Sequence, residues 1–186
     1  MAYNQLDLYY LELINQARAH PGATALALEI DLNEGLEPGT LLNIPRPPLV
    51  LSTTLRNMAV AHSQDMIDND FFSHDSPSTG YGTQERFDNS IYSYTSFAEN
   101  LSIVPTSFVE DDYEMALLMF ETLFIDAGVE GRGHRLSILD GTLRDVGIGH
   151  LVGDWQGNTL THILTQEFGL STNAVKNITG FVLGDT

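Results

Sequence analysis

The chain contains no cysteine among its 186 residues. Disulfide bonds and thiolate metal sites are therefore excluded, although export from the cell is not, because a domain of this length can fold without bridges. The hydrophobic content of 42% is ordinary for a globular protein and is enough to bury one sizeable core. Length and composition together predict a single domain.

Basic residues are scarce, with 8 Lys and Arg against 25 Asp and Glu, which gives a formal net charge of −17. An acidic surface repels the phosphates of nucleic acids and of anionic lipids, so we expect no nucleic-acid partner. The acidity is compatible with binding of divalent cations, and equally with a surface that is simply solvated.

Long apolar runs are also missing, since no stretch approaches the roughly 20 residues of a membrane-spanning helix. We therefore expect no integral membrane association. Residues 1–7 lack the basic region and the cleavage site of a signal peptide. If the protein is exported, its signal has been removed or lies elsewhere.

Apolar residues at helical spacing predict three amphipathic helices, over residues 3–20, 55–70 and 111–126. A shorter helix is predicted over 23–30, before a proline-rich loop over 31–48. The start of that loop, Asp31 to Gly35, faintly resembles a calcium loop but lacks the glutamate that an EF-hand requires. Strands are predicted over 96–104, 146–152, 160–168 and 178–184, with a hairpin loop at 153–158.

Three segments carry the most conspicuous titratable groups: residues 71–77, 97–101 and 131–139. They contain His74, Glu99 and His134, and we expect these three side chains to meet in one cleft. Glu99 interrupts an apolar strand, where a buried carboxylate must find a partner or change its pKa. An edge position at which Glu99 faces water is the alternative. Isolated histidines on predicted helices and strands are interpreted as structural or rim residues: His62, His150 and His162.

Several short motifs, in this order along the chain, resemble the CAP superfamily, which comprises the cysteine-rich secretory, antigen 5 and pathogenesis-related 1 proteins and is also called the SCP domain. The similarity covers roughly residues 6–170 and is strongest to the cysteine-free bacterial branch. The motifs that carry it are Leu13–Arg18, Pro48–Leu49, Ala61–Met66, Phe72–His74, Glu85–Arg86, Ala98–Leu101, Gly133–Arg135, Val146–Gly149 and Thr165–Gly169.

The resemblance implies an α+β fold, an α-β-α sandwich with a small antiparallel sheet between helical layers. It implies a CAP domain over residues 1–170, followed by a tail or the start of a further element at 171–186. A secreted or cell-surface location follows from the resemblance alone.

The resemblance also implies a cleft with two histidines and two acids. By motif these are His74, His134 and Glu99, with the second acid on the helix before Gly133. Glu121 is the first choice for that acid and Asp126 the alternative, since the tryptophan common on this helix is missing.

Such a cleft would bind Zn²⁺ or another divalent metal through His74 and His134. The resemblance permits a small apolar or peptide ligand, with no turnover expected. A metal-assisted or His/Glu-dependent hydrolase is the alternative, although Ser73, Ser76 and Ser137 lie in no nucleophile elbow. A third possibility is a buried polar network that holds helices to the sheet.

Overall fold

The structure, a computed structural model, describes residues 3–106 and 111–172, apart from the side chain of Thr159. A four-stranded sheet of order β1-β3-β4-β2 forms its middle layer. The two long hairpin strands β3 and β4 pair antiparallel, β2 pairs antiparallel with β4, and the short β1 runs parallel to β3. The strands are β1 (Val50–Leu51), β2 (Tyr94–Pro105), β3 (Asp145–Trp155) and β4 (Asn158–Ser171).

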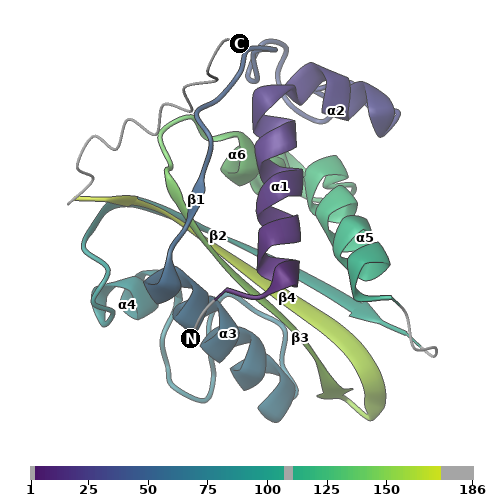
Figure 1. Cartoon of the computed structure of the whole chain (residues 1–186). Coiled ribbons are helices and arrows are strands. Elements are labelled where there is room, and N and C mark those ends of the chain that lie inside the picture. Colours follow the sequence, from purple (N-terminus) through teal and green to yellow (C-terminus); the bar gives the residue numbers. More distant parts are fainter. Residues whose placement is uncertain (1–2, 107–110, 173–186) are drawn as a thin grey trace, which may run out of the picture.

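Helices cover both faces of this sheet (Figure 1). One layer contains α1 (Gln5–Ala19), α2 (Pro21–Ala27), α5 (Asp112–Ile125), the 3-10 turn η1 (Glu130–Arg132) and α6 (Gly133–Leu139). The other contains α3 (Thr53–Asp68) and α4 (Thr83–Asp88). The α-β-α sandwich that the sequence predicts is therefore confirmed.

The core has two parts, one on each face of the sheet. The larger part packs α1 and α5 against the sheet and includes Ile14, Met119 and Phe168. The smaller part packs α3 against the other face, around Met66 and Ile163. Successive residues of a strand point to opposite faces, so the alternation along β2 sends neighbouring side chains into different layers.

Helix α3 approaches the sheet very closely where β3 carries two glycines. A Cβ atom added at Gly147 would lie 2.1 Å from the backbone of Leu55, and one added at Gly149 would lie 2.3 Å from the backbone of Ala59. No side chain fits in that space. The Val-Gly-Ile-Gly motif therefore allows the close packing of α3, the helix that carries His62 and Asp65.

The hairpin between β3 and β4 differs from the prediction. Both strands continue to a two-residue turn, Gln156-Gly157, with positive φ angles of 51° and 81°. Such a turn matches the twist of long strands, which explains why the predicted six-residue loop was too long. The predicted strand at 178–184 lies outside the described residues. Among the described helices, none has the length and apolarity needed to cross a membrane.

Candidate functional site

The segment that carries His74 is irregular and is fixed by polar contacts to both flanking helices. Ser76 Oγ donates to Asp65 of α3 at 2.5 Å, and Arg86 of α4 donates to the carbonyl of His74 at 2.7 Å. The ring of His62 lies 3.1 Å from the carbonyl of Ser73. These contacts hold His74 beside β2 without a regular element of its own.

The first histidine–carboxylate pair joins His74 to Glu99. The Nδ1 atom of His74 lies 2.6 Å from Glu99 Oε1, and the hydroxyl of Thr83 donates to the same oxygen at 2.8 Å. Arg86 donates to the other oxygen, Oε2. The His74 side chain is 51% exposed, whereas that of Glu99 is 1% exposed. A buried carboxylate thus orients a histidine ring that reaches the surface.

A second buried carboxyl group lies directly across the sheet from Glu99. Glu99 and Glu167 are register partners on β2 and β4, so their side chains lie side by side on one face of the sheet, with Arg86 Nε 3.9 Å from Glu167 Oε1. Burial and the charge of Glu99 raise the pKa of Glu167 well above its usual range. Burial alone would raise the pKa of Glu99 too, but the hydrogen bond with His74 and the charge of Arg86 lower it instead. Glu167 is therefore the protonated partner and Glu99 the ionised one.

The second histidine–carboxylate pair joins His134 to Asp126, the residue that ends α5 in a left-handed conformation with φ 55°. Its Oδ1 lies 2.7 Å from His134 Nδ1, and its Oδ2 accepts from the backbone N–H of His134 at 2.9 Å and of Arg135 at 3.4 Å. Burial opposes ionisation of Asp126, yet the hydrogen bonds and the charge from His134 lower its pKa.

Strand β2 connects the two pairs. Glu99 points to the layer of α3 and α4, whereas the next residue, Asn100, donates to the carbonyl of His134 at 3.2 Å and to Gln166 at 3.2 Å. His74 therefore contacts Glu99 on one face of β2, whereas the backbone of His134 contacts Asn100 on the other face. The carboxylate that contacts His134 is Asp126, the alternative in the sequence analysis, whereas Glu121 lies half-buried more than a turn earlier on α5.

Sequence reasoning did not assign a role at the site to Arg86 or Glu167, although both lie in the motifs that carry the family resemblance. The useful signal was the chain position of Glu167, within a predicted strand and directly before Phe168. A carboxyl group in such a strand requires a partner, as was argued for Glu99. His62 is buried, as expected for a structural residue, and burial lowers its pKa.

The serines considered as nucleophiles have other partners. Ser76 donates to Asp65, and Ser137 donates to the carbonyl of Gly133 at 2.9 Å. The Ser73 hydroxyl accepts from the backbone N–H of Asp75 at 3.1 Å. In the described residues, no group of three or more His, Asp or Glu side chains is arranged to hold a metal ion.

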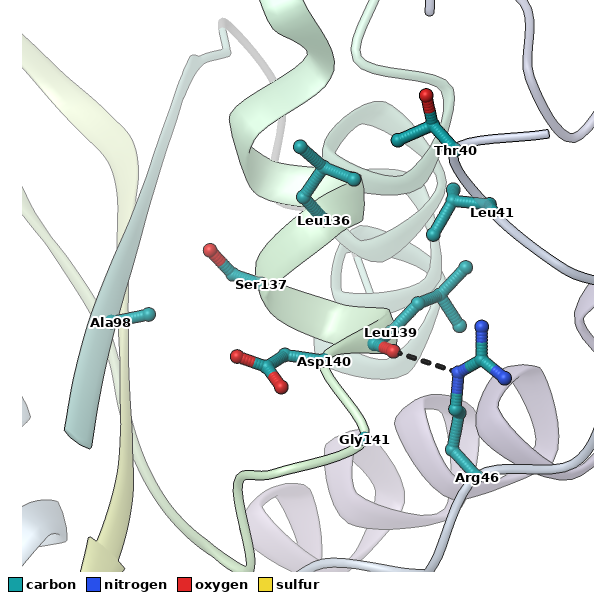
Figure 2. A pocket seen from close by; sticks show the side chains of 9 residues that line it. All are labelled: Thr40, Leu41, Arg46, Ala98, Leu136, Ser137, Leu139, Asp140 and Gly141. Carbon is teal, nitrogen blue, oxygen red and sulfur yellow. Dashed lines mark hydrogen bonds between the residues drawn. The ribbon is translucent and has the colours of Figure 1, made fainter. Parts of the chain in front are cut away.

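A groove of about 520 Å³ lies beside the second pair, across the C-terminal half of α6. Figure 2 shows Ala98 of β2 on one side and Thr40, Leu41 and Arg46 on the other. The side chains of Ser137 and Asp140 point toward Ala98 (Figure 2). The groove combines apolar walls with a few polar groups, which is typical of sites for small ligands.

Comparison with known proteins assigns this sandwich to a known family of proteins. The model of the CAP family, described as the cysteine-rich secretory protein family, matches residues 11–168. The chain therefore belongs to this family, which confirms the resemblance seen in the sequence. A comparison with curated proteins gives no match.

Solved structures with the same fold are distant in sequence. Schistosoma mansoni venom allergen-like protein 4 gives a TM-score of 0.52 at 12% identity, covering 91% of this chain and 90% of that one. NaASP2, crystallised with Zn²⁺, gives 0.53 at 14% identity, with 89% and 80% covered. An extracellular SCP-domain protein from Bacillus anthracis str. Ames gives 0.47 at 24% identity. That match covers 67% of this chain and 34% of that one, so the chain spans about a third of that protein's length.

Proposed function

We propose that this chain is a secreted or cell-surface CAP module that binds a divalent metal, Zn²⁺ or a similar ion, through His74 and His134, without catalytic turnover. The proposal rests on a feature that the two histidines have in common. Each ring places Nδ1 within 2.7 Å of a buried carboxylate, Glu99 or Asp126. A carboxylate at Nδ1 fixes the proton there and leaves Nε2 as a basic lone pair, the arrangement found behind metal-binding histidines.

The two histidines are ligands of a type that suits Zn²⁺, but two is a small number of protein ligands for this ion. Within the described residues, Nε2 of neither His74 nor His134 makes a hydrogen bond, so both atoms are free to act as ligands. Neutral imidazoles are good ligands for Zn²⁺, and water or a ligand would have to supply the remaining positions. A site with two protein ligands is expected to be weaker than a catalytic zinc site with three. When bound, the ion would supply a Lewis acid with open positions.

Two further observations support the proposal. The fold relative NaASP2 was crystallised with Zn²⁺. The net charge of −17 favours accumulation of cations near the surface. The groove beside α6 supports a second part of the proposal, a small apolar or peptide ligand held between Ala98 and Leu41.

Zinc titration by calorimetry tests the metal site. We expect micromolar binding by the wild type at pH 7.5, weaker binding at pH 5.5, and loss of binding in the His74→Ala/His134→Ala double variant. Binding weakens at the lower pH because protons compete for the two Nε2 atoms. His20→Ala is the control, since His20 is exposed at the end of α1, outside the site.

The outcomes separate the alternatives. Equal binding by the wild type and the double variant would refute the proposed ligands. Hydrolysis of an ester or peptide that is lost in His134→Ala, with the fold retained, would instead establish the hydrolase. If no metal binds at either pH, the two pairs are a structural network, and both single variants should then lose stability by ~1–3 kcal/mol.

A further inference from the structure

Two buried arginines fix the two ends of helix α6 by the same kind of contact. Arg135, near its first residue, and Arg18 of α1, near its last, are both fully buried. Each guanidinium donates to backbone carbonyls rather than to a carboxylate side chain. The two arginines differ in the elements of the fold that contain those carbonyls.

Two of the four carbonyls that Arg135 binds belong to the residues immediately before Asp126. Its Nε donates to Phe124 at 2.7 Å and its Nη2 to Ile125 at 2.5 Å, the last two residues of α5. Both carbonyls lie at a helix end, where the backbone leaves acceptors without partners. Their hydrogen bonds to Arg135 determine where the chain leaves α5, and therefore where the left-handed residue Asp126 presents its carboxylate.

The same guanidinium also reaches a loop that is distant in sequence. Its Nη1 donates to the carbonyls of Leu32 and Glu34 at 3.0 and 3.1 Å. Arg132 repeats this connection from the other side, donating to Glu34 at 3.2 Å and to the carbonyl of Asp126 at 3.0 Å. The segment that faintly resembled a calcium loop thus has two of its carbonyls occupied by arginine.

We propose that Arg135, assisted by Arg132, is the positioning residue of the second histidine–carboxylate pair: it holds Asp126 in the conformation that keeps the His134 proton on Nδ1. The expected effect on zinc affinity rests on the proposed function. The tautomer of His134, in contrast, is a property of the metal-free protein. The two can therefore fail separately.

The test compares Arg135→Lys with Arg18→Lys. Lysine keeps the positive charge, but its single nitrogen cannot bind four carbonyls in a fixed plane. Nitrogen-15 NMR of the histidine rings at pH 7.5, without metal, should show the Nδ1–H tautomer of His134 in the wild type. We expect a mixture of tautomers in Arg135→Lys and an unchanged ring in Arg18→Lys. His74, in the same spectra, is the internal reference and should not change.

Zinc affinity is the second readout. Loss of an outer partner of a metal ligand typically costs 10- to 100-fold in affinity, so we expect a loss of about that size in Arg135→Lys and less than about 3-fold in Arg18→Lys. Thermal unfolding of both variants separates this effect from a general loss of stability. Both arginines are equally buried, so both variants should melt at lower temperature.

Three results would overturn the proposal: an unchanged His134 tautomer in Arg135→Lys, equal changes in both arginine variants, or an equal change at His74. If Arg135→Lys does not fold, Arg132→Gln tests the proposal instead, because Arg132 is only partly buried. Its replacement removes a hydrogen bond to the carbonyl of Asp126 and should shift the same His134 signal by a smaller amount. Absence of zinc binding in the wild type would refute the metal site and leave the tautomer result as the test of Arg135.

Discussion

The two histidine–carboxylate pairs look alike at the ring and differ in how the carboxylate is kept charged. Glu99 lies in the middle of a strand and receives its hydrogen bonds from three side chains: His74, Thr83 and Arg86. Asp126 lies between two helices and receives backbone N–H groups of His134 and Arg135 in addition to the His134 ring.

The first pair is therefore part of a network of side chains, whereas the second depends on a local turn of the backbone. The charge of Glu99 is balanced by Arg86, a residue 13 positions earlier, and depends on a proton held by Glu167. Asp126 depends on N–H groups only eight and nine residues later in the chain. A side-chain network can lose any one member and leave the others buried without a partner, whereas a turn loses mainly its own hydrogen bonds.

The largest effect is expected for Glu99→Ala. Removal of one partner of a buried ion pair leaves the other charge unpaired, which costs about 3–5 kcal/mol of stability. Here the guanidinium of Arg86 would remain, with 10% of its side chain exposed, and the carboxyl group of Glu167, 3.9 Å from its Nε, is protonated and does not balance the charge. Urea unfolding measures the loss. The double variant Glu99→Ala/Arg86→Met is the control and should recover part of it, because the orphaned charge is gone. A loss below about 1 kcal/mol in the single variant would show that Glu99 is not in a buried network.

A smaller loss, about 2 kcal/mol, is expected for Asp126→Gly, since hydrogen bonds to a charged acceptor are lost but no buried charge is left behind. Glycine accepts the left-handed conformation of this residue, so the variant isolates the carboxylate. The lowered pKa of Asp126 makes its contribution depend on pH. A depressed carboxyl pKa stabilises the fold above the unfolded pKa, and this stability is lost as pH falls through the folded pKa. The difference between wild type and variant should therefore shrink below about pH 4; a constant difference would contradict the assignment.

Much of this comparison could be predicted from the sequence, because the family motifs place His74, Glu99 and His134 by chain order. The helices α1, α3 and α5 and the strands β2, β3 and β4 followed from periodicity, and their ends shifted by a few residues where caps and turns decide. The helix α6 was not predicted, since Gly131 to Gly133 suggests a loop. It begins there because Gly131 and Arg132 adopt positive φ angles of 75° and 48° before the helical turn.

The identity of the second acid could not be decided from the sequence. Glu121 has the more typical position, in the middle of a helix, and Asp126 lies beyond it, two residues before Gly128. What distinguishes them is backbone conformation: Asp126 at φ 55° turns its carboxylate back to the first residues of α6. Propensity indicates only that aspartate tolerates the left-handed region, which is a weak signal. The cross-strand partner of Glu99 was missed for a similar reason, because register decides that Glu167 lies opposite.

The smallest effect is expected for Glu167→Gln, and it tests the protonation of the network directly. At pH 6 a neutral amide replaces a neutral carboxyl group of nearly the same size beside Glu99, so the unfolding free energy should stay within about 1 kcal/mol of the wild type. A group whose folded pKa is raised contributes stability below its unfolded pKa and loses it as pH rises through the folded pKa. Only the wild type carries this loss at Glu167, so the variant should gain relative stability between pH 6 and pH 9. That gain is opposite in direction to the pH effect at Asp126. A difference that stays constant between pH 6 and pH 9 would mean that Glu167 is already ionised in the folded protein, with both glutamates beside the charge of Arg86.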